Sequence, residues 1–302
     1  MNGNEQPRKK RFFFRRNKPR RLQYITLLPS LVTLINGVCG FAAIGMAAKG
    51  PEHFAAAGFM LYAAMIADML DGRLARMSHS TSSFGGQLDS LCDMLSFGAA
   101  PAFLSFKLLM GTLPIILSPS IKLMGDFVER LIWLAAAVYL CCAAVRLARF
   151  NVENVEDETA HMSFSGLPTP AAAGVLASLI ILYQHLVSDA ARDTLLFEAG
   201  RWLIIHTLPF ITIGLAALMV SRIRYPHVVN QYLRGKKPIT HLVWAGVLFS
   251  LIFLCGLQVA MAIAFAGFAS TGFVRWLWYH TFLGRLFGRK LQQPVGPHQH
   301  VV

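Results

Sequence analysis

Long apolar segments alternate with short polar segments along the chain after residue 28. Eight of these segments approach the length of a bilayer-spanning helix, which needs about 20 mostly apolar residues. They cover residues 29–48, 54–75, 85–109, 127–149, 168–188, 203–221, 241–257 and 259–279. The last two share one run without charged residues, 242–274, in which we expect a turn at Gly256 and Gln258. The pattern therefore predicts an all-α polytopic membrane protein.

Composition excludes the alternative of a large soluble domain. Of the 302 residues, 55% are hydrophobic and only 14% are charged. A soluble protein carries roughly a quarter charged residues, which cover its core. This chain has too little charge to cover a core of its size.

Positive charge predicts the orientation of the spans. Residues 1–28 hold nine basic side chains and one acid, and the 222–240 loop holds five basic side chains and no acid. Basic segments flank spans on the cytoplasmic side, and such a segment beside a first span favours anionic lipid over nucleic acid as its partner. We therefore expect cytoplasmic N- and C-termini and an even number of spans. The expected cytoplasmic segments are 1–28, 76–84, 150–167, 222–240 and the C-terminal tail.

Four aspartates lie where the second and third spans meet the short 77–84 loop. Asp68 and Asp71 are spaced i, i+3, and Asp89 and Asp93 are spaced i, i+4, so each pair falls on one helix face. Two antiparallel helices would aim the four carboxylates at one point, where they would repel one another. Hard divalent cations such as Mg²⁺ or Mn²⁺ accept oxygen ligands, and two of them would neutralise four carboxylates.

Small residues and an arginine accompany these acids. Gly72 and Ala75 would leave a shallow surface beside the cations, on which Arg76 could bind phosphate. Together these features indicate a diphosphate site. The alternative is a polar helix hairpin whose small residues serve close packing and whose acids line a pore. Intramembrane acids rarely lack a function, which favours the diphosphate site.

With these residues, the chain resembles the CDP-alcohol phosphotransferase family. Its signature reads Asp68-x2-Asp71-Gly72-x2-Ala75-Arg76-x8-Gly85-x3-Asp89-x3-Asp93, eight fixed residues over 26 positions. The resemblance implies a membrane enzyme with six core helices, here with about two extra C-terminal spans. It also implies two divalent cations, Mg²⁺ or Mn²⁺, and transfer of a phosphatidyl or similar group from a CDP-linked donor with release of CMP.

The family's roles carry over to the matching residues. Asp68, Asp71 and Asp89 would bind metal, and Asp93 would bind metal and act as the general base. A second group would shape the nucleotide and diphosphate site, namely Gly72, Ala75, Arg76 and Gly85. Thr33 and Asn36, on a polar stripe of the first span, would contact the nucleotide, although such a stripe also serves ordinary helix packing. The chain has Ser30 after Pro29, where the family often has asparagine.

Three further segments, "RLARFN", "GLPTPAAA" and "LMVSRIRYP", resemble the membrane-embedded CDP-diacylglycerol–serine O-phosphatidyltransferases, a branch of this family. This resemblance implies CDP-diacylglycerol as donor and L-serine as acceptor. We expect the active site at the cytoplasmic side of a bacterial inner membrane. Arg146 or Arg149 would bind the serine carboxylate. Both arginines also fit a site for the donor's phosphate, or plain positive-inside anchors. Homodimers are common in the family.

Two alternatives remain open. The first is another acceptor, such as glycerol 3-phosphate, inositol phosphate or choline, and the second is a cation-coupled transporter. The expected organisation is a basic segment (1–28), a membrane domain (29–226), a transmembrane hairpin (227–283) and a cytoplasmic tail (284–302).

Overall fold

The structure is a computed structural model that describes residues 20–78, 83–116, 122–156, 166–188, 195–223, 225, 252 and 256–278. These residues form helices and short connections, with no strand among them. The helices are α1 (Arg20–Lys49), η1 (Pro51–His53), α2 (Phe54–Ser78), α3 (Ser83–Asp93), η2 (Met94–Ala99), α4 (Ala100–Ile116), α5 (Lys122–Glu156), α6 (Thr169–Ser188), α7 (Leu195–Val220) and α10 (Leu257–Trp278). The prediction of an all-α polytopic membrane protein is confirmed.

Within the described part of the chain, seven segments are long and apolar enough to cross a bilayer. Six of them coincide with the first six predicted spans, and the seventh, Leu257–Val274, coincides with the last. Helices α3, η2 and α4 follow one another without a break, so they form a single span, Phe84–Thr112. The predicted span 241–257 lies almost wholly outside the described residues, as do most of the basic segment 1–28 and all of the tail 284–302.

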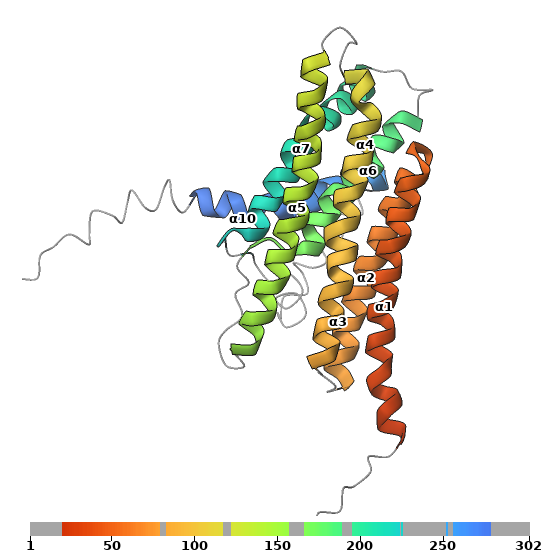
Figure 1. Ribbon diagram of the computed structural model, residues 1–302, viewed down its shortest axis with the longest axis vertical. Coiled ribbons are helices and arrows are strands. Elements are labelled where there is room, and N and C mark those ends of the chain that lie inside the picture. Colours follow the sequence, from red (N-terminus) through yellow and green to blue (C-terminus); the bar gives the residue numbers. More distant parts are fainter. Residues whose placement is uncertain are drawn as a thin grey trace, which may run out of the picture.

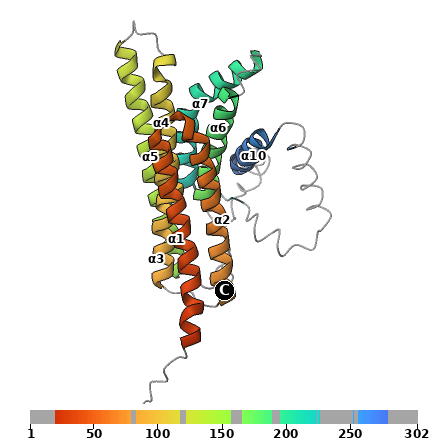
Figure 2. The same ribbon diagram turned by 90° about the vertical axis from the view of Figure 1, so that its right-hand side faces the viewer.

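Helices α1 to α5 run along the long axis of the molecule (Figure 1). Helix α10 runs across this bundle and packs on α6 (Figures 1 and 2). Hydropathy predicts the length of an apolar helix, but neighbouring helices set its direction. The hairpin 227–283 stays a prediction, because only its second half is described.

Small side chains are buried on the packed helices, and large apolar ones are exposed. Ala43 and Ala47 on α1 and Ala57 on α2 are fully buried. In contrast, Phe41 is 68% exposed and Phe210 is 65% exposed. A soluble protein rarely exposes so much apolar surface, whereas helices in lipid pack through small residues and present large apolar side chains to the acyl chains.

The segment before α6 is held against the end of α7. The Gly166 N–H donates to the Ile223 carbonyl at 2.8 Å, and the Leu167 N–H donates to the Leu218 carbonyl at 3.0 Å. Gly166 has a φ of 93°, which L side chains rarely adopt, and a Cβ there would collide with the carbonyl of Met219. This close contact fixes where α6 begins, and therefore where Thr169 lies.

Candidate active site

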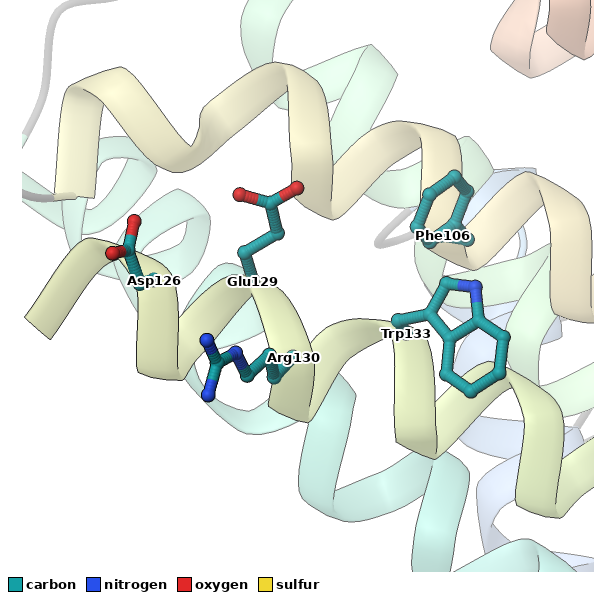
Figure 3. Close-up of a pocket in the computed structure, with 5 residues that line it drawn as sticks. All are labelled: Phe106, Asp126, Glu129, Arg130 and Trp133. Carbon is teal, nitrogen blue, oxygen red and sulfur yellow. The ribbon is translucent and has the colours of Figure 1, made fainter.

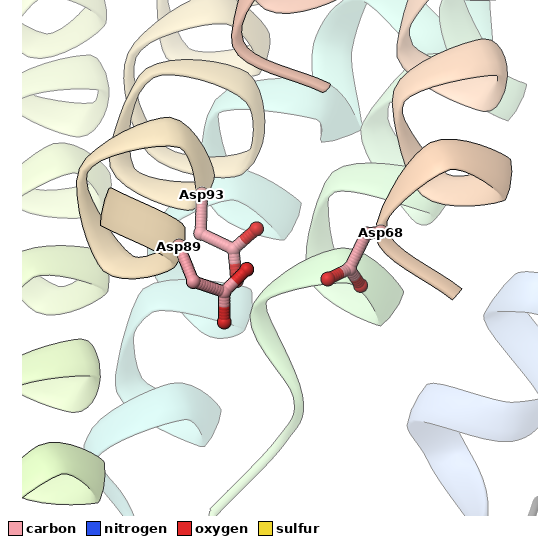
Figure 4. A group of neighbouring side chains, drawn as sticks. All are labelled: Asp68, Asp89 and Asp93. Atoms are coloured by element: carbon pink, nitrogen blue, oxygen red, sulfur yellow. The ribbon is translucent and has the colours of Figure 1, made fainter. Parts of the chain in front are cut away.

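Three of the four aspartates come together where α2 ends and α3 runs beside it. Carboxylate oxygens of Asp68, Asp89 and Asp93 all lie within 4.8 Å of one another. Asp89 and Asp93 are one turn apart on α3 and face Asp68 on α2 (Figure 4). The predicted convergence of the two helices on one cluster is thus present for these three residues.

The fourth aspartate, Asp71, lies beside the cluster and is turned toward α1. Its side chain is buried, and its Oδ2 accepts a hydrogen bond from the Thr33 hydroxyl. Residues spaced i, i+3 on a helix differ in direction by about 60°, so Asp71 and Asp68 share a face without pointing to the same place. Asp71 still interacts electrostatically with Asp68 and Asp89.

Asp93 has polar neighbours from two other helices. Asn36 Nδ2, on α1, donates to Asp93 Oδ1 at 2.9 Å. The guanidinium of Arg146, on α5, attracts the same carboxylate electrostatically. Thr33 and Asn36, expected to contact a nucleotide, therefore direct these hydrogen bonds at aspartates, and direct contact with a nucleotide stays a prediction.

A π-helical turn, η2, follows Asp93 directly. The Ser96 hydroxyl donates to the Asn36 carbonyl at 2.8 Å, and the Tyr139 hydroxyl donates to the Phe97 carbonyl at 3.2 Å. Such turns are rare and frequently occur at functional sites. Sequence reasoning missed η2, because the apolar pattern of this span continues through it.

Arg146 is the better placed of the two candidate arginines. Its Nη1 donates to the Thr169 hydroxyl at 3.1 Å, at the first residue of α6. Its Nε is buried and has no hydrogen-bond acceptor among the described residues. Arg149 lies one turn further along α5. Binding of the serine carboxylate by Arg146 or Arg149 stays a prediction.

The remaining predicted residues lie at the ends of α2 and α3. Gly72 is exposed, and no described atom beyond its own helix lies within 4 Å of where its Cβ would stand. Gly85 is half-buried in the first turn of α3. The side chains of Ala75 and Arg76 lie outside the described set.

One polar pair near the site was also missed in the sequence. The Ser90 hydroxyl and the Asn151 side-chain amide lie 2.9 Å apart and join α3 to α5. Asn151 lies in the quoted "RLARFN" segment, but no spacing rule relates it to Ser90. This pair keeps the helix of Asp89 and Asp93 next to the helix of Arg146.

A cavity of about 320 Å³ lies near the N-terminal end of α5, the end away from Arg146 (Figure 3). Phe106 on α4 lines it together with residues of α5 that include Asp126, Arg130 and Trp133. Twenty residues of α5 separate Asp126 from Arg146, which corresponds to about 30 Å along the helix. The cavity is therefore remote from the aspartate cluster.

The donor set of the cluster fits a hard divalent cation. Asp68, Asp89 and Asp93 offer only carboxylate oxygens, the ligands that Mg²⁺ and Mn²⁺ prefer. Carboxylates this close repel one another unless a cation or proton intervenes. Arg146 supplies one positive charge, and a bound cation would supply the rest.

Comparisons with known proteins identify the family of the chain. Residues 26–213 match the family model described as CDP-alcohol phosphatidyltransferase. Three curated relatives carry the name CDP-diacylglycerol–serine O-phosphatidyltransferase. The protein of Helicobacter pylori is 30% identical over 83% of this chain and 91% of its own length. Those of Bacillus subtilis and Methanocaldococcus jannaschii are each 30% identical, over 66% and 70% of this chain and 90% and 79% of their own lengths. The chain therefore belongs to the CDP-alcohol phosphatidyltransferase family and is an integral membrane enzyme.

Proposed function

We propose that this enzyme transfers the phosphatidyl group of CDP-diacylglycerol to the hydroxyl of L-serine, giving phosphatidylserine and CMP. The single observation that supports it most is that the guanidinium of Arg146, half-buried on α5, interacts electrostatically with the proposed base Asp93. The names of the curated relatives point to the same donor and acceptor.

In this proposal the four aspartates Asp68, Asp71, Asp89 and Asp93 hold two divalent cations, Mg²⁺ or Mn²⁺. When bound, such cations supply charge neutralisation for the diphosphate and for the departing CMP. The open face of Gly72 leaves room for a diphosphate next to the cluster. Gly85, with Ala75 and Arg76, completes the proposed nucleotide and diphosphate site.

The chemistry needs one proton acceptor and one nucleophile. Asp93 takes the proton of the serine hydroxyl, because a neutral hydroxyl is a poor nucleophile near neutral pH. The serine oxygen then forms a bond to the lipid-side phosphorus. The bond between that phosphorus and the bridging oxygen breaks, and the oxygen leaves with CMP. No covalent enzyme intermediate is needed.

Arg146 is the proposed partner of the serine carboxylate. Guanidinium and carboxylate groups pair strongly. The buried Nε of Arg146 has no acceptor among the described residues, so it could donate a hydrogen bond to a ligand. The hydrogen bond to Thr169 holds the side chain in place and leaves that nitrogen unused. A serine bound here would lie next to Asp93.

The arginine assignment predicts different effects for two neighbouring variants. Arg146→Gln should raise the KM for serine about 10-fold or more, because hydrogen bonds to charged groups contribute about 1.5–3 kcal/mol. Arg149→Gln should change this KM less. Serine saturation curves of the two purified variants check the assignment, and a larger rise for Arg149→Gln would move the carboxylate site to Arg149.

An assay with different acceptors tests the proposed function against its alternatives. Purified protein receives CDP-diacylglycerol, Mn²⁺ or Mg²⁺, and serine, glycerol 3-phosphate, inositol phosphate or choline in turn. CMP release with serine alone supports the proposal. Release with another acceptor instead would keep the chemistry and change the substrate. If no acceptor led to CMP release and the protein transported cations, the transporter would be favoured.

The proposed location is a bacterial inner membrane, with the aspartates near the cytoplasmic face and both termini in the cytoplasm. The basic residues of 1–28 and 222–240 support this orientation. Reporters fused at Met1 and after Val302 should both report the cytoplasm. A reporter after Val302 that faces outward would mean that the 242–274 run crosses only once. The family resemblance also supports a homodimer, which the mass of the detergent-solubilised complex would test.

A further inference from the structure

Two polar side chains of α1 reach the aspartates from one helix face. Thr33 is 3% exposed and Asn36 is fully buried, and the two are one turn apart. The Thr33 hydroxyl donates to Asp71 on α2, and Asn36 Nδ2 donates to Asp93 on α3 at 2.9 Å. Helix α1 thus contacts one carboxylate from each of the two helices that carry the aspartates.

The orientation of the Asn36 amide follows from the chemistry of its partner. With a cation bound, the Asp93 carboxylate would be ionised and would only accept hydrogen bonds, which fits the observed donation from the amide nitrogen. The amide oxygen is then buried and has no donor among the described residues. An unsatisfied buried acceptor lowers stability, and a small apolar residue would pack here without that loss. The asparagine is therefore explained by its bond to Asp93 rather than by packing.

Close packing fixes the distance between α1 and the helix that carries Asp93. A Cβ at Gly37 would stand 3.0 Å from the Cys92 sulfur, and one at Gly40 would collide with Ser96. The Ser96 hydroxyl donates to the carbonyl of Asn36 itself, at 2.8 Å. The backbone that carries Asn36 is thus held on both sides of its contact with Asp93.

We propose that Thr33 and Asn36 are positioning residues, which fix the rotation of the Asp71 and Asp93 carboxylates so that these bind divalent cations. This inference rests on the proposed function, in which the aspartates are the metal ligands. It assigns both residues a role through the aspartates rather than through direct contact with the nucleotide. Partners that orient metal ligands typically contribute about 10- to 100-fold to metal affinity or activity.

The test measures Mn²⁺ binding to purified protein in detergent, without substrates. The electron paramagnetic resonance signal gives the concentration of free Mn²⁺ as Mn²⁺ is added. Thr33→Val replaces the hydroxyl by a methyl group of similar size and should weaken Mn²⁺ affinity about 10- to 100-fold. Thr33→Ser keeps a hydroxyl and should recover most of that affinity. Thr212→Val is the matched control, because Thr212 is a buried threonine of α7 whose hydroxyl donates to the carbonyl of Leu208.

Asn36→Leu keeps the branching of the side chain, removes the amide and should weaken Mn²⁺ binding to a similar extent. If this variant does not fold, the comparison of Thr33→Val with Thr33→Ser decides alone. Wild-type affinity in Thr33→Val and Asn36→Leu would overturn the positioning role, and lower CDP-diacylglycerol affinity with unchanged Mn²⁺ binding would do the same. Both results would be consistent with the aspartates as metal ligands. A wild-type protein that binds no Mn²⁺ would overturn both proposals.

Discussion

Asp93→Asn should lower turnover by about 100-fold or more, the usual scale for general-base catalysis. The amide keeps the size of the side chain and one oxygen, so it can still accept the hydrogen bond from Asn36. It cannot take the proton of the serine hydroxyl. CMP release and CDP-diacylglycerol binding, measured in the same preparation, check this expectation.

Binding should fall less than turnover in this variant, because Asp68, Asp71 and Asp89 remain. Asp126→Asn is a suitable control, since Asp126 lines the remote cavity near the other end of α5. Near wild-type turnover in Asp93→Asn would place the base elsewhere. Equal losses of binding and turnover would assign Asp93 chiefly to metal binding.

Removal of divalent cations should abolish activity in the wild-type protein. A chelator should stop CMP release, and excess Mn²⁺ or Mg²⁺ should restore it. Asp68→Ala or Asp89→Ala should reduce turnover by more than about 100-fold, because loss of a direct metal ligand costs more than loss of a residue that only orients a ligand. Each variant should still insert into the membrane.

Two measurements check these statements. The first is CMP release in chelator, before and after the metal is added back. The second is the yield of each aspartate variant in the membrane fraction. Full activity of the wild-type protein in chelator would contradict the two-cation proposal, whatever the variants do.

The apolar pattern predicted the helices of this fold well. The length of an apolar run sets where a bilayer-spanning helix can begin and end, and six predicted spans coincide with α1 to α7. The direction of α10 could not be predicted, because it depends on packing against α6 rather than on hydropathy. The π turn η2 was also missed, since one extra residue in a helical turn leaves an apolar run unchanged.

Helical spacing predicted the aspartate cluster itself, but not its surroundings. The i, i+4 spacing of Asp89 and Asp93 placed both on one face, as observed (Figure 4). The orientation of Asp71 toward Thr33 depends on how α1 packs beside α2. Sequence periodicity does not predict that packing. The same holds for the surroundings of Arg146. Both arginines fit the sequence pattern, and the contact of Arg146 with Thr169 appears only once α5 and α6 are placed together.

The central claim is that serine accepts the phosphatidyl group of CDP-diacylglycerol at this aspartate cluster. Its most direct test is a single measurement with purified protein, Mn²⁺, CDP-diacylglycerol and radiolabelled serine. We expect labelled phosphatidylserine and CMP in a one-to-one ratio from the wild-type protein, and neither product from Asp89→Ala. No labelled lipid from the wild-type protein, or equal labelled lipid from Asp89→Ala, would contradict it.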